Sequence, residues 1–596
     1  MQLSSLDWYI LAGFFITLLL IGFWASKKAG KSVNEFFLSG RNMPWWLLGI
    51  SMVATTFSAD TPNLVTDIVR TNGVSGNWVW WAFLLTGMLT VFVYAKLWRR
   101  SEVLTDLEFY ELRYGGKGAA FLRGFRAVYL GVFFNIMIMA TVCLAAIKIG
   151  GVMLGLDPEE TLLIACSVAV MYSSIGGLKS VIMTDFFQFT LAMLATFWAA
   201  AVIVNLPQVG GLENLINHPD IVPKLDLIPD ISNTELFITI FLLPLALQWW
   251  SVWYPGAEPG GGGYVAQRML SAKNENHAVW ATLLFNFMHY AIRPWPWILV
   301  ALASLIVFPN LDDLQSAFPD IDSSVIGHDL AYPAMMTLLP AGLLGLLLAS
   351  LAAAFMSTIA SHLNWGSSYV VNDFYKRFLK PDATDRQMVG LGRITTVILM
   401  LLSAGLALLL SNALQAFNIL LQVGAGTGLI FILRWFWYRI NVYSEITAMI
   451  VSFLVALYLQ IIHPRLGFEI IPSEFQLVIG VTITTIIWIS VTLLTPTEDQ
   501  KTLQEFYRKI QPGGMGWKKV VDQAKKDGIN IEGEKGAWDV PTGILCMLIG
   551  SITIYSFLFS IGYFLYKDFN LAFILLSVSI ISLYFLNKTW RKLKMA

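Results

Sequence analysis

The sequence predicts an all-α protein that crosses a membrane many times. Of its 596 residues, 56% are hydrophobic and 13% are charged, which is about half the charged fraction of a soluble protein. Apolar runs recur along the chain, and each is long enough to cross a bilayer as a helix. Lysine and arginine gather in alternate loops, as they do in the cytoplasmic loops of membrane proteins.

The apolar runs predict about 15 spans. The loop charges place the N-terminus outside and the C-terminus inside. No positively charged segment precedes the first run, which indicates a retained span and not a cleaved signal peptide. The spans are expected near residues 7–26, 45–69, 77–98, 121–148, 159–175, 181–205, 233–254, 277–308, 332–371, 388–411, 414–436, 443–463, 475–495, 542–564 and 569–587.

Composition excludes several classes of protein. The formal net charge is zero, and the absence of a basic nucleic-acid motif indicates that the chain does not bind nucleic acid. Cys143, Cys166 and Cys546 all lie in apolar segments, where they are expected to be buried hydrophobic residues without a disulfide or metal framework. No nucleophile motif or metal-ligand spacing appears, so the sequence does not indicate an enzyme.

Two of the predicted spans are interrupted. Residues 58–63 place a proline and polar side chains inside the second span, and residues 254–263 carry two prolines and four consecutive glycines after the seventh. Such sequences cannot continue a helix. The interruptions stand in corresponding positions of two possible five-helix units, 45–205 and 233–436, a pattern that indicates an inverted-repeat transporter.

The stretch 344–375 carries a face of small and hydroxyl residues. Ala354, Ser357, Thr358 and Ser361 are spaced so that they share one side of a helix. Hydroxyl oxygens on an approachable backbone suit a small hard cation. The same residues also serve as contacts between membrane helices, and spacing alone leaves both interpretations open.

Four ordered segments resemble the sodium:solute symporter family. They are NEFFLSGRNMPWWLLGISMVATTFSAD, YSSIGGLKSVIMTDFFQF, YVAQRMLSAK and MSTIASHLNWGSSYVVNDFY. The resemblance covers roughly residues 7–465. It implies a LeuT-type fold of two inverted five-helix repeats that works by alternating access. The expected organisation is an N-terminal extra helix (1–40), the repeats (41–206 and 207–440), two further helices (441–495), a cytoplasmic insert (496–541) and two C-terminal helices (542–596).

The resemblance implies that sodium is the transported coupling ion. Its ligands would be the carbonyl oxygens of Ala54, Phe57 and Ala354 and the hydroxyls of Ser357 and Thr358, and a face with no titrating side chain argues against proton coupling. Asp185 and Ser361 would lie on the ion path, although an ion pair of Asp185 at the inner surface is the alternative. Relatives with a second sodium site carry a hydroxyl where this chain has Ala360, so one sodium per cycle is expected.

The solute is expected near the middle of the membrane, between the two interruptions. A sugar-like molecule is the first expectation, with an amino acid or an anion as the alternative, and a membrane sensor or enzyme as the rival class. Arg293 is expected to pair with Asp60, Asp67 or Glu258, or else to bind an anionic solute. The candidate solute contacts are Asp60, Thr61, Asp67, Trp80, Gln248, Trp249, Trp253, Tyr254 and Gln422.

Overall fold

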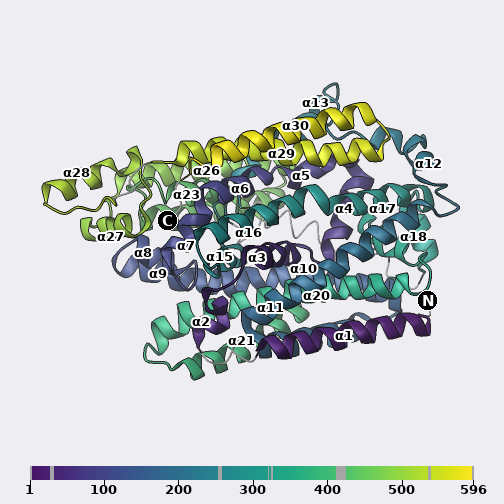
Figure 1. Ribbon diagram of the computed structural model, residues 1–596, viewed down its shortest axis with the longest axis horizontal. Helices are drawn as coiled ribbons and strands as arrows, with labels where there is room; N and C mark the ends of the chain where they lie inside the picture. The colour runs from purple at the N-terminus through teal and green to yellow at the C-terminus, as the bar shows by residue number, and fades with distance from the viewer. Residues whose placement is uncertain are drawn as a thin grey trace.

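The computed structural model describes residues 3–26, 32–252, 258–319, 321, 323, 326–410, 424–533 and 538–593. Within these residues eleven helical segments are long and apolar enough to cross a membrane. In Figure 1, α1 (Ser5–Ser26) lies along one side of the bundle, α29 (Val540–Leu565) and α30 (Phe569–Trp590) lie along the opposite side, and α3 (Trp45–Thr56) and α20 (Leu343–Ser368) lie between them. The predicted all-α fold is confirmed.

The remaining helices follow in chain order. Those before the second interruption are α2 (Val33–Leu38), α4 (Asp60–Asn72), α5 (Trp78–Trp81), α6 (Leu84–Leu89), α7 (Ala95–Ser101), α8 (Glu108–Arg113), α9 (Gly116–Val128), α10 (Asn135–Leu154), α11 (Pro158–Val204), α12 (Leu212–Asn217), α13 (Thr234–Leu236) and α14 (Leu243–Ala246). Those after it are α15 (Gly263–Leu270), α16 (Glu275–Phe287), α17 (Pro294–Val307), α18 (Leu311–Ala317), α19 (Ala331–Met336), α21 (Asp385–Ala407), α23 (Gly428–Leu433), α24 (Val442–Leu457), α25 (His463–Arg465), α26 (Ser473–Leu494), α27 (Gln500–Ile510) and α28 (Lys518–Lys526).

Turns of π-helix and 3₁₀-helix join or extend many of these helices. The π-helical segments are η3 (Thr90–Tyr94), η4 (Tyr129–Phe134), η6 (Phe237–Leu242), η8 (Met288–Ile292), η11 (Tyr369–Leu379) and η13 (Tyr458–Ile462). The 3₁₀ segments are η1 (Ser39–Arg41), η2 (Val74–Asn77), η5 (Val222–Lys224), η7 (Gln248–Trp250), η10 (His328–Leu330), η12 (Ala425–Thr427) and η14 (Met515–Trp517). Wide π turns are frequent at functional sites, since they displace side chains from the regular helical face.

The first interruption lies where the sequence predicts it. The helix α3 ends at Thr56, Phe57 adopts φ −94° and ψ 79°, and α4 begins at Asp60. The Thr61 hydroxyl donates to the Thr56 carbonyl (3.4 Å), and the Ser58 amide donates to the Thr61 hydroxyl (3.3 Å). These side-chain bonds satisfy main-chain groups that the missing helical turn leaves free.

The second interruption is confirmed in the part that the structure describes. Residues 253–257 lie outside the described residues; among the others, helical structure ends at Trp250 and begins again at Gly263, the first residue of α15. Gly260 and Gly261 between them have φ of +84° and +94°, a conformation that favours glycine. The Gly263 amide donates to Asp106 (2.9 Å), whose pKa rises to about 6 because of burial and the neighbouring Glu258 carboxylate. The Asp106 carboxylate therefore anchors the start of α15 to the loop before α8.

One predicted span differs from the structure. The expected span 332–371 is split, because α19 ends at Met336 and α20 begins only at Leu343, after Gly342 at φ +86°. The expected division between 159–175 and 181–205 is confirmed, because Gly177 has non-helical φ and ψ and separates two helices within α11, of which Gly177–Val204 is long and apolar enough to cross a membrane. The first part of the expected span 414–436, up to residue 423, lies outside the described residues, and the total of about 15 spans and the orientation stay predictions.

The 496–541 insert packs against the helical bundle. Phe506 of α27 stacks on Trp517 with ring centroids 5.4 Å apart, and the Trp517 indole donates to the Trp435 carbonyl (2.9 Å). Both aromatic side chains are buried. The insert therefore covers one end of the bundle and forms no hydrophobic core separate from it.

Replacing Gly177 by alanine should destabilise the protein. Its φ of 58° and ψ of −172° lie in a region that only glycine occupies readily, so Gly177→Ala should cost about 1–3 kcal/mol. We expect a lower midpoint of thermal unfolding for the detergent-solubilised protein. Gly405→Ala is the matched control, since a methyl group there meets open space in a regular helix. Equal midpoints for the two variants would contradict the assignment of the bend to Gly177.

Candidate cation and solute site

The hydroxyl face of α20 points into the protein. Ser357, Thr358 and Ser361 are all buried, as is Ala354. The Thr358 hydroxyl donates to the Thr55 carbonyl at 2.8 Å, which lies in the last turn of α3. The middle of α20 therefore contacts the end of α3, where the helix is interrupted.

Two expected cation ligands lie at this end of α3: Ala54 is in its last turn, and Phe57 directly follows it. The Phe57 amide donates to the carbonyls of Val53 (2.9 Å) and Ala54 (3.1 Å). Each carbonyl oxygen has two lone pairs, so the Ala54 oxygen keeps one for another partner. The Thr55 carbonyl is absent from the sequence-predicted set, although it is the one that contacts Thr358.

Asp185 of α11 lies beside this face. Its carboxylate accepts hydrogen bonds from the hydroxyls of Ser357 (2.6 Å) and Ser51 (2.5 Å). The Arg268 guanidinium lies 3.8 Å away, and neither charged side chain is exposed. The ion pair that the sequence leaves as an alternative role for Asp185 is present, deep in the protein and away from its surface.

Arg268 is the residue that the sequence interpretation missed. It donates to the hydroxyls of Ser361 (2.6 Å), Ser51 (3.2 Å) and Thr55 (3.4 Å). A usable signal was present, because a charged residue within the YVAQRMLSAK segment has to be paired if it lies in the membrane. Arg268 and Asp185 thus join α3, α11, α15 and α20 through one buried polar network.

The candidate solute residues fall into two groups. In the first, the Gln248 amide donates to the Val79 carbonyl (2.7 Å), and the Trp249 carbonyl accepts from the Thr86 hydroxyl (2.5 Å). Trp80 stacks on Tyr290 with centroids 5.9 Å apart. Trp80 also meets His289 edge-on, and His289 contacts the Thr56 hydroxyl (3.1 Å), so this group reaches the first interruption.

The second group lies along α4. Asp60, Asn63 and Asp67 line a cavity of about 10 Å³, which is room for roughly one water molecule. The other polar residues around it, Lys148 and Asp329, form an ion pair of 2.6 Å. Thr61 caps the interruption, as described above. Asn63 is a further residue absent from the sequence-predicted set.

The structure corrects the expected pairing of Arg293. No carboxylate of the described residues lies within 4.0 Å of it, and Glu258 pairs with Arg126 instead. Arg293 contacts the Thr56 hydroxyl (3.2 Å) and His289 (3.2 Å) and lies over the Trp297 ring. These neutral groups disperse its charge, a role that spacing along the chain does not reveal.

Three candidate solute residues lie outside the described residues. They are Trp253, Tyr254 and Gln422. Their proposed contacts with a solute stay predictions.

An interrupted helix that faces hydroxyl groups inside a bundle of apolar spans defines a class of protein, the multi-pass membrane transporters. The family model of the sodium:solute symporter family matches residues 36–452. The chain belongs to this family, as its four sequence segments indicate. It is therefore a multi-pass protein of the cell membrane, and a transporter and not an enzyme.

Curated relatives and solved structures agree with this assignment. The chain is 26% identical over 480 residues to a sodium/glucose cotransporter of Vibrio parahaemolyticus, covering 77% of this chain and 86% of that one. It is 28% identical over 500 residues to a sodium/mannose cotransporter of Bos taurus, covering 78% and 80%. The structure of a Na⁺-coupled sialic acid symporter aligns with a TM-score of 0.64 at 20% identity, covering 83% of this chain and 99% of that one. The LeuT-type fold is confirmed.

Removing the Asp185 charge should destabilise the protein strongly. Asp185→Asn leaves the buried Arg268 without its counter-charge, which typically costs about 3–5 kcal/mol. We expect a clear fall in the thermal midpoint, with partial recovery in the double variant Asp185→Asn/Arg268→Gln. Glu213→Gln is the control, because its ion pair with Lys567 is exposed and its loss should leave the midpoint unchanged. A double variant no more stable than the single one would argue against this pairing.

Proposed function

We propose that the protein imports a small sugar-like solute together with sodium by alternating access. The supporting observation is a set of buried polar atoms without hydrogen-bond partners just after the first interruption. They are Asn63 Oδ1 and Nδ2, and Thr66 Oγ1. The relatives named for glucose and mannose favour the same class of solute.

Unpartnered polar atoms of this kind are costly inside a protein. Each buried donor or acceptor left unsatisfied costs about 1–3 kcal/mol. A sugar offers several hydroxyl groups, and each one donates and accepts. A solute that reaches this part of α4 when the bundle opens would satisfy these atoms, and binding would recover part of that cost.

The proposed sodium site joins α20 to α3. Sodium would bind the carbonyl oxygens of Ala54, Phe57 and Ala354 and the hydroxyls of Ser357 and Thr358. The 2.8 Å bond from Thr358 to Thr55 supports this, because it holds the two helices at hydrogen-bond distance. Sodium that bridges them in the outward-facing state would raise the affinity for solute, and the solute would raise the affinity for sodium equally.

One sodium per cycle is the proposed stoichiometry. Ala360 offers no side-chain oxygen, and the Arg268 guanidinium already donates to Ser361 at 2.6 Å. A fixed positive charge among these hydroxyls would repel a second cation. Asp185 would then guide the single sodium on its way out, while Arg268 balances the carboxylate charge when the ion has left.

A solute that carries a carboxylate is the second candidate. Arg293 is buried, its Nε has no hydrogen-bond partner, and the described residues hold no carboxylate within ion-pair distance. Arginine binds carboxylates with paired hydrogen bonds. Competition of neutral and acidic sugars for uptake would separate the two candidates.

Sodium dependence should be lost when the α20 hydroxyls are removed. For Ser357→Ala/Thr358→Ala in proteoliposomes we expect sugar uptake no longer stimulated by an inward sodium gradient, since two of five ligands are gone. The control is Ser367→Ala on the same helix, whose hydroxyl donates only to the Asn364 carbonyl. Unchanged stimulation in the double variant would exclude these residues from the site.

Solute affinity should depend on Asn63. Asn63→Ala removes two polar atoms that no other residue satisfies, so the KM for sugar should rise roughly tenfold. The thermal midpoint should hardly change, because no hydrogen bond within the protein is lost. Uptake measured over a range of sugar concentrations checks this, with Asn217→Ala as a surface control. An unchanged KM would remove Asn63 from the proposed solute site.

A further inference from the structure

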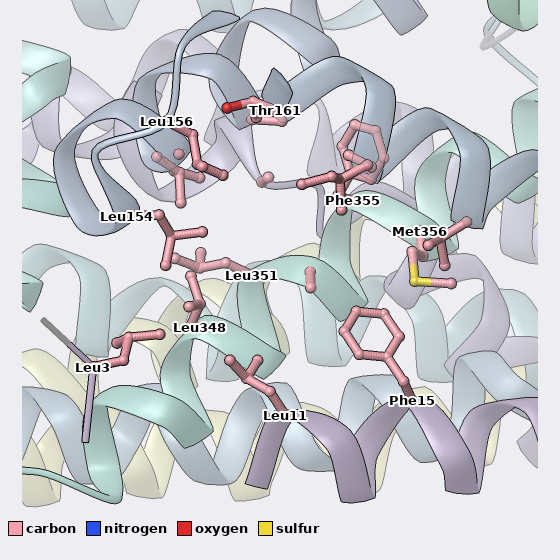
Figure 2. A pocket seen from close by; sticks show the side chains of 18 of the residues that line it. Leu3, Leu11, Phe15, Leu154, Leu156, Thr161, Leu348, Leu351, Phe355 and Met356 are labelled. Carbon is pink, nitrogen blue, oxygen red and sulfur yellow. The ribbon is translucent and has the colours of Figure 1, made fainter. Parts of the chain in front are cut away.

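A large apolar cavity lies between α1, α10, α11 and α20 (Figure 2). Its volume is about 760 Å³, within the range of pockets that enclose a drug-sized ligand. Leu11 and Phe15 of α1 line it on one side, and Leu351 and Phe355 of α20 face them. The space is far larger than the polar cavity beside α4, and it belongs to neither the proposed sodium site nor the solute site.

The lining has the chemistry of a hydrocarbon site. None of the lining side chains is charged, and apart from Thr161 and the indole of Trp8 none carries an oxygen or nitrogen atom. Thr161 Oγ1 is buried without a hydrogen-bond partner, and the side chain as a whole is only 7% exposed. A ligand that fits here is a long apolar chain with one acceptor near Thr161.

The cavity adjoins the lipid-facing surface. Trp8 and Ile164 line it and are also 58% and 56% exposed. Trp8 lies in a helix that is apolar and long enough to cross the membrane. The exposed side chains of this helix therefore contact the hydrocarbon of the bilayer and not water. An apolar cavity with this access is filled from the bilayer, because water gains no hydrogen bonds there.

We propose that this cavity binds one acyl chain of a membrane phospholipid. Thr161 lies in the first turns of α11, after the capping residue Asp157 and close to the helix end, where the ester groups of a lipid are found at the membrane boundary. Its free hydroxyl would donate to an ester carbonyl. The acyl chain would then extend past Leu351 toward Phe355 and Met356, which Figure 2 shows across the cavity from Leu3 and Leu154.

The deep end of the cavity reaches the two segments that form the proposed sodium site. Ala59 lines the cavity and directly precedes α4 at the first interruption, while Met356 precedes Ser357 on α20. An acyl chain that binds only the conformation in which this cavity is open would stabilise that conformation relative to the other states of the transport cycle. This coupling rests on the proposed function, whereas binding of the lipid does not.

Native mass spectrometry of the full chain purified in mild detergent tests the proposal. We expect one phospholipid to remain bound to the natural protein and to Ala201→Phe, a control whose alanine is exposed on the same helix α11 outside the cavity. Ala165→Phe fills the cavity and should lose roughly nine-tenths of that lipid, as a tenfold weaker affinity predicts. If Ala165→Phe fails to fold, Ala352→Leu on α20 provides the same measurement.

Equal lipid retention in the natural protein and the filled variant would overturn the proposal. Retention of detergent or a sterol in place of a phospholipid would overturn it as well. A rise in the thermal midpoint on adding back phospholipid, seen in the natural protein and in Ala201→Phe but not in Ala165→Phe, would support it. None of these measurements needs sodium or sugar, so failure here is distinct from failure of the proposed transport function.

Discussion

The structure depends on how it satisfies the main-chain groups that are freed where α3 stops. In a membrane no water reaches them, so each one needs a partner from the protein or a ligand. Thr61 caps the break from one side, and Thr358 of α20 binds the Thr55 carbonyl from the other. Because partners come from two helices, the break is held in place only while α20 is packed against it.

The most deeply buried charges of the site lie on two neighbouring helices, α11 and α15. Asp185 and Arg268 belong to opposite halves of the chain, and hydroxyls from α3 and α20 lie between them. A buried ion pair rarely adds net stability, but it strongly disfavours arrangements in which one charge is left alone. The network therefore restricts how the two proposed repeats can move relative to each other, which is what alternating access requires.

Polar and apolar spaces are separated on the two sides of this network. The polar cavity along α4 is nearly closed, with unsatisfied atoms on Asn63, whereas the apolar cavity behind α20 is wide and adjoins the lipid-facing surface. The polar cavity along α4 has room for roughly one water molecule and is too small for a sugar.

Much of this architecture was predictable from local sequence. The apolar runs, the two interruptions and the hydroxyl face of 344–375 each depend on a few neighbouring residues. The described residues contain eleven apolar spans, the first interruption and the buried hydroxyl face. Local pattern failed where the backbone has alternatives. Residues 332–371 read as one apolar run, yet α19 ends at Met336 and the chain turns at Gly342 before α20 begins.

The sequence by itself determined the fold class, the family and the type of residue at the proposed cation site. Only the tertiary structure decided which groups meet: that Asp185 pairs with Arg268, that Thr358 binds Thr55, and that Arg293 contacts Thr56 and His289. The physical reason is that helix periodicity is set by neighbours along the chain. Partners across the bundle are set by how distant helices pack, and spacing in one helix carries no information about the register of another.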